Sequence, residues 1–291
     1  MSSIDFTWVI GGPQGGGVET AANIFAGACA GCGLKVFGKR EYYSNIKGEH
    51  SYFGVRISDK IIRSNVSGIT MLVGFDAETL FRHADAVFND GAIVYETDLS
   101  EIKIDEVHTL DAQFKERLKK YLLSKNKPLT IQGSLDDAKE RGITLYPVSF
   151  KEILANLSDE TKNPKLRGMF RMQNVLAVSI SIGLLGLPPE TLLKSVVSVF
   201  SRKTEIAEMN KIAANYAYNI ATVKYSKFRY QLSQIPKEEH TIMAQGFQST
   251  SLGKIACGCR FQSYYPITPA SDESVFLESN EIFEVENNRP G

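Results

Sequence analysis

A run of glycines between an apolar strand and a helix constrains this sequence more than any other feature. The segment Phe6–Ile10 is apolar, with aromatic and β-branched residues, and it is followed directly by Gly11-Gly12-Pro13-Gln14-Gly15-Gly16-Gly17. Val18–Ala30 then has the composition of a helix, and Leu34–Phe37 that of a second strand. This order predicts the start of a βαβ unit. The expected fold class is therefore α/β, with a Rossmann-like doubly wound sheet.

The pattern continues as further strands and helices and then becomes helical. More strands are predicted at Tyr52–Ile57, Met71–Val73, Ala92–Tyr95 and Ile143–Val148. Helices are predicted at Asp76–Ala84, Leu110–Leu123, Phe150–Leu157, Met169–Leu185, Pro189–Phe200 and Glu205–Thr222. We expect Asp76 to be an N-cap and Pro189 to occupy a first helical position.

A change of composition divides the chain. We expect a first domain at 1–223, a basic and aromatic linker at 224–240, and the beginning of a second α/β domain at 241–291. In the last part the sequence predicts a helix at Gln248–Cys257, a strand at Phe261–Tyr264 and a helix after Pro269. About fifty residues cannot bury a domain core unaided. We therefore expect either a cut chain or a segment that completes its fold on another polypeptide.

Charge and apolar patterning exclude several classes of function. The chain has 33 basic and 33 acidic residues, so it lacks the basic surface expected of a nucleic-acid or anionic-membrane binder. The longest apolar stretch, Val175–Leu187, is shorter than the roughly 20 residues that span a bilayer. Because the N-terminal residues also lack a signal-peptide pattern, we expect a cytoplasmic protein with reduced cysteines.

The glycine turn allows two interpretations. Glycines between a strand and a helix let backbone N–H groups face an anion such as a phosphate. The dinucleotide fingerprint fails because Gln14 and Thr20 stand at glycine positions, and no Gly-Lys-Ser/Thr completes a P-loop. The alternative is a tight turn that needs positive φ angles and close packing of strand and helix. The residues alone leave both open.

Two other groups of residues could carry chemistry. Tyr42–His50 contains Lys47, Glu49 and His50 and would lie at a ligand crevice if both flanking strands were parallel, but a solvated connection with a structural His50 is the alternative. The pairs Cys29/Cys32 and Cys257/Cys259 have spacings that only half match a four-thiolate metal site. Because both pairs end predicted apolar helices, we favour packing in the core and predict no metal site.

The segment Tyr265-Pro266-Ile267-Thr268-Pro269 has a simple structural interpretation. Thr268 suits an N-cap and Pro269 the first position of a helix, whose start carries Asp272 and Glu273. The same geometry would present a hydroxyl and helix N–H groups to a small carboxylate. The physical argument alone does not choose between these interpretations.

At these residues the sequence resembles the 2-oxoacid:ferredoxin oxidoreductases, specifically the archaeal-type alpha subunit in which a gamma domain precedes an alpha domain. The resemblance rests on the glycine turn, on Lys47-Gly48-Glu49-His50, and above all on Tyr265–Pro269 after a helix carrying Gly246, Leu252, Gly253 and Gly258. In that family the alpha part is a thiamine-enzyme pyrimidine-binding domain.

The resemblance implies oxidative decarboxylation of a 2-oxoacid such as pyruvate to an acyl-CoA, with electrons passed to ferredoxin. It also implies thiamine diphosphate with Mg²⁺ and a 4Fe-4S cluster, both mainly on a partner beta subunit, and coenzyme A as co-substrate. The expected assembly is a heterodimer or a dimer of heterodimers. The alternative function is a non-catalytic module that binds coenzyme A or a nucleotide and assists assembly.

The resemblance also assigns roles to residues. It places Thr268 at the 2-oxoacid, with Tyr265, Pro266, Ile267 and Pro269 shaping the pocket. It makes a second set of residues candidates for the phosphates of coenzyme A: Gly12, Gln14, Gly15, Gly16, Gly17 and Lys47. Two departures matter: Phe247-Gln248-Ser249 follows Gly246 where many relatives have Asn and Ala, and the family's glutamate and arginine for cofactor and substrate fall beyond Gly291. We therefore expect no activity from the isolated chain.

Overall fold

The computed structural model describes residues 4–13, 15–42, 50–169, 172–201, 203–238, 241–267 and 270–280, and it forms two compact units, 1–238 and 239–291. The strands of the first unit are β1 (Asp5–Pro13), β2 (Lys35–Tyr42), β3 (His50–Ser58), β4 (Ile69–Gly74), β5 (Val87–Glu96) and β6 (Thr144–Val148). Its α-helices are α1 (Val18–Gly31), α2 (Ala77–His83), α3 (Ala112–Ser124), α4 (Ile131–Glu140), α5 (Phe150–Glu160), α6 (Gln173–Leu184), α7 (Pro189–Val199) and α8 (Thr204–Lys224). Short 3-10 helices lie at Ala84–Ala86, Thr97–Leu99, Ile104–Glu106 and Pro164–Gly168.

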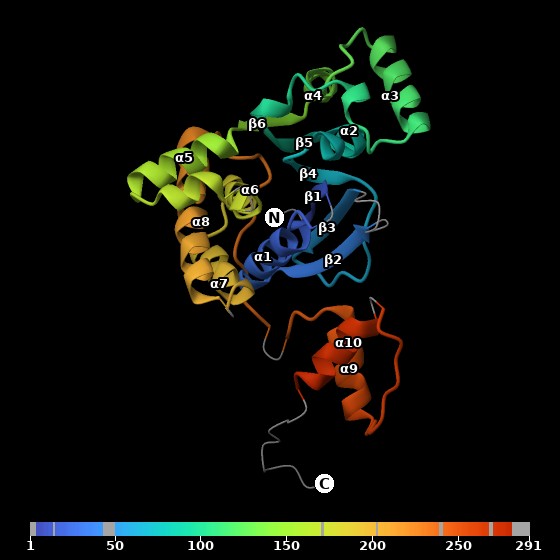
Figure 1. Ribbon diagram of the computed structural model, residues 1–291, viewed down its shortest axis with the longest axis vertical. Coiled ribbons are helices and arrows are strands. Elements are labelled where there is room, and N and C mark those ends of the chain that lie inside the picture. The colour runs from blue at the N-terminus through green and yellow to red at the C-terminus, as the bar shows by residue number, and fades with distance from the viewer. Residues whose placement is uncertain are drawn as a thin grey trace. The chain divides into compact units, whose positions relative to one another are not determined.

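The described strands form one sheet in the order β2-β3-β1-β4-β5-β6 (Figure 1). Strands β1, β4, β5 and β6 are parallel, whereas β3 runs antiparallel to both β1 and β2. The sheet is therefore mixed. Because β3 is reversed, its first residue, His50, pairs with the last residue of β1, Pro13. The end of β2 and the start of β3 thus lie at the same edge as the carboxyl ends of the parallel strands.

Helices cover both faces of the sheet, which confirms the doubly wound fold. Trp8 and Ile10 of β1 face a core formed with α1, α6, α7 and α8, whereas Val9 points into a second core with α2, α3 and α4. The side chain of Trp8 is fully buried, stacks on Phe25 at 4.2 Å between ring centroids, and donates its indole N–H to the Ser181 hydroxyl at 3.1 Å. The side chains on both faces of β1 are buried, which explains the continuous apolar run in its sequence.

The helical part follows the predicted order closely. Pro189 begins α7, and α5, α6 and α8 cover most of the remaining predicted spans. Helix α4 was missed: Thr130 caps it by accepting the Gly133 N–H, but the segment carries few apolar residues. Residues 225–238 run over the first unit, where Phe228 and Leu232 are buried. Among the described residues, no helix is long and apolar enough to cross a membrane.

The second unit contains α9 (Gly246–Ala256) and α10 (Ala270–Glu278). The rings of Phe247 and Phe276 meet edge to face, and the buried Ser251 hydroxyl contacts the carbonyls of Phe247 and Glu273. The strand predicted at Phe261–Tyr264 is wrong, because that segment has no strand structure. A strand needs a neighbouring strand for its backbone hydrogen bonds, and within the described part of this unit none is present.

Candidate functional site at the carboxyl edge of the sheet

The edge where β1 and β4 end is the natural place for a ligand in this fold. The two strands are parallel neighbours, and the helices that follow them, α1 and α2, pack on opposite faces of the sheet. Doubly wound sheets bind ligands at such a reversal, outside the carboxyl ends of the strands. The glycine turn follows β1 at this point.

The glycine turn has a backbone that only glycine adopts easily. Gly15 and Gly17 have φ angles of 78° and 85°, and the Gly16 N–H closes the turn onto the Pro13 carbonyl at 2.9 Å. Gly17 is the N-cap of α1, and within the described ranges no side chain caps this helix. The first N–H groups of α1 are therefore available to an anion. Gln14 lies outside the described residues.

Asn174, near the start of α6, contacts the glycine turn through its side-chain amide. Its Nδ2 donates to the Gly16 carbonyl at 2.5 Å, and it lies 2.2 Å from the position that a Cβ on Gly17 would take. The Oδ1 atom of Asn174 is buried and has no hydrogen-bond partner in the described part of the chain. Sequence reasoning missed Asn174. Its only signal was a polar residue directly before an apolar helix, which does not reveal a contact 158 residues away.

A second group of polar residues lies over β1 just before the turn. Asp76 follows β4 and accepts both the backbone N–H and the hydroxyl of Thr79 at 2.8 Å, which confirms it as the N-cap of α2. Burial raises the pKa of Asp76. A Cβ on Gly11 would lie 2.6 Å from the Thr79 hydroxyl, and one on Gly12 would lie 3.4 Å from Asp76 Oδ2. Gly11 and Gly12 therefore let these side chains approach the strand.

The buried His50 and the partly buried His83 form an imidazole pair at the same edge. Their Nε2 atoms are 3.2 Å apart, so one ring donates and the other accepts. Burial, followed by the charge of Arg82, lowers the pKa of His50 to about 4, and burial with neighbouring charges lowers that of His83 to about 3. Both rings are thus neutral near pH 7. His50 Nδ1 is buried without a partner among the described residues.

The connection that contains Lys47 would lie at a ligand crevice if both flanking strands were parallel, and this condition is not met. Strands β2 and β3 are antiparallel neighbours. Residues 43–49, Lys47 among them, lie outside the described residues. The flanking residues Tyr42 and His50 nevertheless belong to the edge where β1 ends, because the reversal of β3 returns the chain there.

The Tyr265–Pro269 segment lies in the second unit, immediately before α10. Tyr265 and Ile267 are 76% and 59% exposed, and the Ile267 N–H bonds the Tyr265 carbonyl at 2.7 Å. The Ser271 N–H then bonds the Ile267 carbonyl, so the chain turns into the helix as expected. Thr268 and Pro269 lie outside the described residues. The role of Thr268 therefore stays a prediction from the sequence.

The cysteines divide into two kinds. Cys29 and Cys32 are buried in the core, as expected, and burial raises the pKa of both thiols. Cys257 and Cys259 are exposed, so the prediction that they pack in a core is wrong. They flank Gly258, which follows the C-cap of α9 with a φ of 77°, and this end of the helix is exposed. In the described ranges, no three His, Cys, Asp or Glu side chains gather as metal ligands do.

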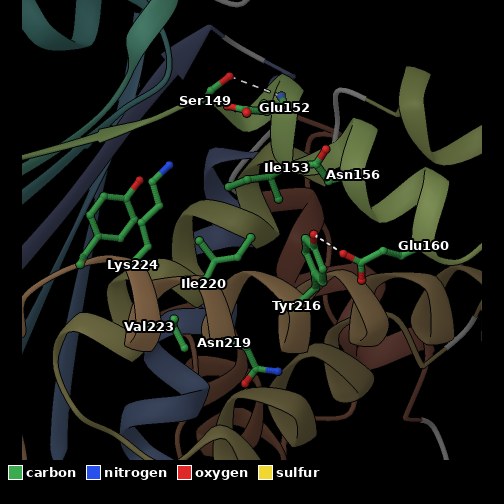
Figure 2. Close-up of a pocket in the computed structure, with 11 residues that line it drawn as sticks. Ser149, Glu152, Ile153, Asn156, Glu160, Tyr216, Asn219, Ile220, Val223 and Lys224 are labelled. Carbon is green, nitrogen blue, oxygen red and sulfur yellow. Dashed lines mark hydrogen bonds between the residues drawn. The ribbon is translucent and has the colours of Figure 1, made fainter.

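A groove of about 550 Å³ lies elsewhere, between α5 and α8. Figure 2 shows Ile153 and Ile220 in its middle, with the Tyr216 hydroxyl donating to Glu160 at one side. Burial, helped by Glu152, raises the pKa of Tyr225 to about 12. None of the residues predicted from sequence to bind a ligand lines this groove.

Comparisons with known proteins agree with this fold. The family model described as pyruvate ferredoxin/flavodoxin oxidoreductase matches residues 7–220. The chain is 42% identical over 275 residues to 2-oxoacid:ferredoxin oxidoreductase 1, subunit alpha, of Sulfurisphaera tokodaii. The matched region covers 94% of this chain and 42% of the relative. It is 40% identical over 282 residues to the corresponding subunit alpha of Saccharolobus solfataricus, covering 96% and 43% of the two chains.

A solved structure shows the same fold. It is a 2-oxoglutarate:ferredoxin oxidoreductase from Magnetococcus marinus with 2-oxoglutarate, coenzyme A and succinyl-CoA bound, and it matches with a TM-score of 0.68 at 19% identity. The match covers 97% of this chain and 42% of that one. This chain thus spans less than half the length of the relatives it matches. The extent of the family match and the identity to the curated subunits show that the chain belongs to the pyruvate ferredoxin/flavodoxin oxidoreductase family.

Proposed function

We propose that this chain serves as part of the alpha subunit of a 2-oxoacid:ferredoxin oxidoreductase. The complex would convert a 2-oxoacid and coenzyme A into an acyl-CoA and carbon dioxide while reducing ferredoxin. The observation that carries the proposal is the 42% identity, over 94% of the chain, to a subunit of that name. In this proposal, residues 1–223 form a gamma domain, 224–240 a linker and 241–291 the beginning of an alpha domain.

The catalytic cofactors of such a complex, thiamine diphosphate with Mg²⁺ and a 4Fe-4S cluster, would lie mainly on the beta subunit. Because the described residues form no metal-ligand cluster, they do not fit the Mg²⁺ of thiamine diphosphate or a 4Fe-4S cluster, and we derive no step through these groups. The partners in this proposal are the beta subunit, in a heterodimer or a dimer of heterodimers, and ferredoxin. A cytoplasmic location is part of the same proposal.

The contribution of the first unit would be a binding site for coenzyme A phosphates at the glycine turn. The uncapped N-terminus of α1 supports this, because its N–H groups need an acceptor that no described side chain supplies. Apart from its chain neighbours, Gly15 also has no described atom within 4 Å of where its Cβ would be, which would let a ligand approach the turn from that side. Gln14 and Lys47 remain candidates from the sequence.

The contribution of the second unit would be contact with the 2-oxoacid through Thr268. The N-terminus of α10 follows this residue, so a hydroxyl and helix N–H groups would meet a carboxylate or a developing negative charge together. Tyr265, Pro266, Ile267 and Pro269 would form the wall beside it.

Turnover by the assembled enzyme tests the proposal. An alpha subunit of the relatives' full length, combined with its beta subunit, should reduce ferredoxin or a dye when given a 2-oxoacid and coenzyme A. In this assembly Thr268→Ala should lower kcat/KM for the 2-oxoacid by about tenfold to a thousandfold. Thr250→Ala is the control, because Thr250 is exposed and its hydroxyl donates to the Gly246 carbonyl of its own helix. Equal activity of the two variants would contradict the role of Thr268.

A second candidate function is a non-catalytic module that binds coenzyme A or a nucleotide and assists assembly. The same uncapped helix in the first unit favours it. The two functions differ in the assembled complex: a catalytic subunit gives turnover that depends on Thr268, whereas an assembly module binds coenzyme A and yields no turnover with any beta subunit.

A further inference from the structure

The N-terminus of α1 has the features of an anion site. This helix is 14 residues long and begins at a glycine cap, and its first N–H groups meet no side-chain acceptor among the described residues. The one acidic residue of its first turn, Glu19, is paired with Arg40 at 2.6 Å. The ion pair offsets the negative charge that would otherwise repel an anion from this turn.

Asn174 contributes a hydrogen-bond acceptor, whereas the N-terminus of α1 contributes donors. Its Nδ2 is committed to the Gly16 carbonyl, which fixes the amide orientation and leaves Oδ1 as an acceptor. Asn174 is only 5% exposed, and Oδ1 has no donor in the part of the chain that the structure describes. A buried acceptor without a donor destabilises the folded protein. A ligand donor at the turn would remove that cost.

A ligand that satisfies both groups needs acceptor oxygens for the helix and one hydrogen for Asn174. We propose that Asn174 is a specificity residue of the glycine turn, whose Oδ1 accepts a hydrogen bond from the hydroxyl of a protonated phosphate group bound at the N-terminus of α1. Inorganic phosphate and protonated phosphate monoesters carry such a hydroxyl, whereas sulfate and the internal phosphates of a diphosphate do not. This inference rests on the proposed binding of phosphate groups by this turn and names the kind of phosphate that it prefers.

Phosphate and sulfate are the probes that isolate this hydrogen bond. At about pH 8 inorganic phosphate is mainly the dianion HPO₄²⁻, which has the charge and shape of sulfate and differs by one hydrogen. Titration calorimetry, with the amide NMR signals of Val18 and the Asn174 side chain followed in parallel, measures both anions on the chain of 291 residues. We expect wild type to bind phosphate about tenfold more tightly than sulfate.

Variants identify the residue responsible for the preference. Asn174→Leu keeps the volume of the side chain and should bring the phosphate-to-sulfate ratio close to one. Asn210→Leu is the matched control: Asn210 is 4% exposed, and its amide bonds the Ile206 carbonyl on its own helix. It should keep the tenfold ratio. Circular dichroism verifies that each variant folds.

Each outcome has a defined meaning. A ratio near one in wild type would overturn the role of Asn174 and leave anion binding at the turn intact. A tenfold ratio that persists in Asn174→Leu would overturn it as well. No binding of either anion would overturn this inference together with the proposed phosphate site. Because the ratio in wild type needs no variant, a failure of Asn174→Leu to fold does not remove the test.

Discussion

Replacing two glycines of the same turn by alanine separates backbone strain from steric displacement. Gly15 and Gly17 both have φ angles near 80°, at 78° and 85°. A Cβ added at Gly15 would have no described atom beyond its chain neighbours within 4 Å, whereas a Cβ added at Gly17 would lie 2.2 Å from Asn174 Nδ2. Both substitutions therefore strain the backbone, and only Gly17→Ala must also displace the Asn174 side chain.

The magnitudes follow from these contacts. A left-handed backbone costs a residue with a Cβ about 1–2 kcal/mol, so Gly15→Ala should lower the free energy of unfolding by about that amount. Gly17→Ala carries the same strain and must also displace Asn174, which breaks its bond to the Gly16 carbonyl. Losing that hydrogen bond costs about 1 kcal/mol, and more if the carbonyl stays unpaired. Gly17→Ala should therefore cost about 1–2 kcal/mol more than Gly15→Ala.

Urea unfolding followed by circular dichroism measures both values. A double-mutant cycle adds the mechanism: in an Asn174→Ala background the space at Gly17 is open, so Gly17→Ala should then cost no more than Gly15→Ala. Equal losses for the two glycine variants in the wild-type background would refute the reasoning. An unchanged cost of Gly17→Ala in the Asn174→Ala background would also refute it.

Three further predictions concern the first unit. Ser181→Ala leaves the buried Trp8 N–H unpaired and should lower the free energy of unfolding by about 2 kcal/mol, with a shift in the emission of this single tryptophan. Arg141→Lys removes a guanidinium that donates to the carbonyls of Ala84, Asp85 and Val87. Thermal unfolding should show that the free energy of unfolding falls by about 2 kcal/mol. An unchanged free energy of unfolding would contradict the role of this contact. The His50–His83 pair should make stability fall as the pH drops from about 6.5 toward 4. The unfolded state takes up protons in this range and the folded state does not, so the unfolding free energy at pH 5 should fall relative to pH 7 by less in His83→Leu than in wild type.

Local signals in the sequence predicted much of the first unit. The glycine turn between strand and helix, the Asp76 cap and the Pro189 helix start all appear in the structure as expected. These features depend on neighbouring residues, because capping and turn conformations are decided within a few positions. Helix α4 was missed because its sequence has a cap but only a weak apolar pattern.

Features set by strand pairing were harder to predict. The reversed direction of β3 depends on its partners β1 and β2. The strands predicted at Leu34–Phe37 and Tyr52–Ile57 left a connection long enough for a parallel crossover of about a dozen residues, so the sequence did not reveal the reversal. The strand expected at Phe261–Tyr264 failed for the same reason, because apolar composition does not supply a partner. Strand pairing is a tertiary property that a local pattern does not contain.

The candidate site was only partly visible in the sequence. The glycines were identified, whereas Asn174 and His83 reach the site through contacts 158 and 33 residues distant along the chain. His50 was noticed for its neighbours Lys47 and Glu49, yet its described partner is His83 on α2. Polar side chains that a fold gathers from separate helices leave no periodic signal.

The central claim is that the glycine turn at the carboxyl edge of β1 binds phosphate groups of coenzyme A. Hydrogen exchange with and without saturating coenzyme A, read by mass spectrometry, tests it most directly. The account predicts slower exchange at residues 15–21 and around Asn174, with little change at the α5–α8 groove. Protection confined to that groove, or no protection anywhere in the first unit, would contradict the claim.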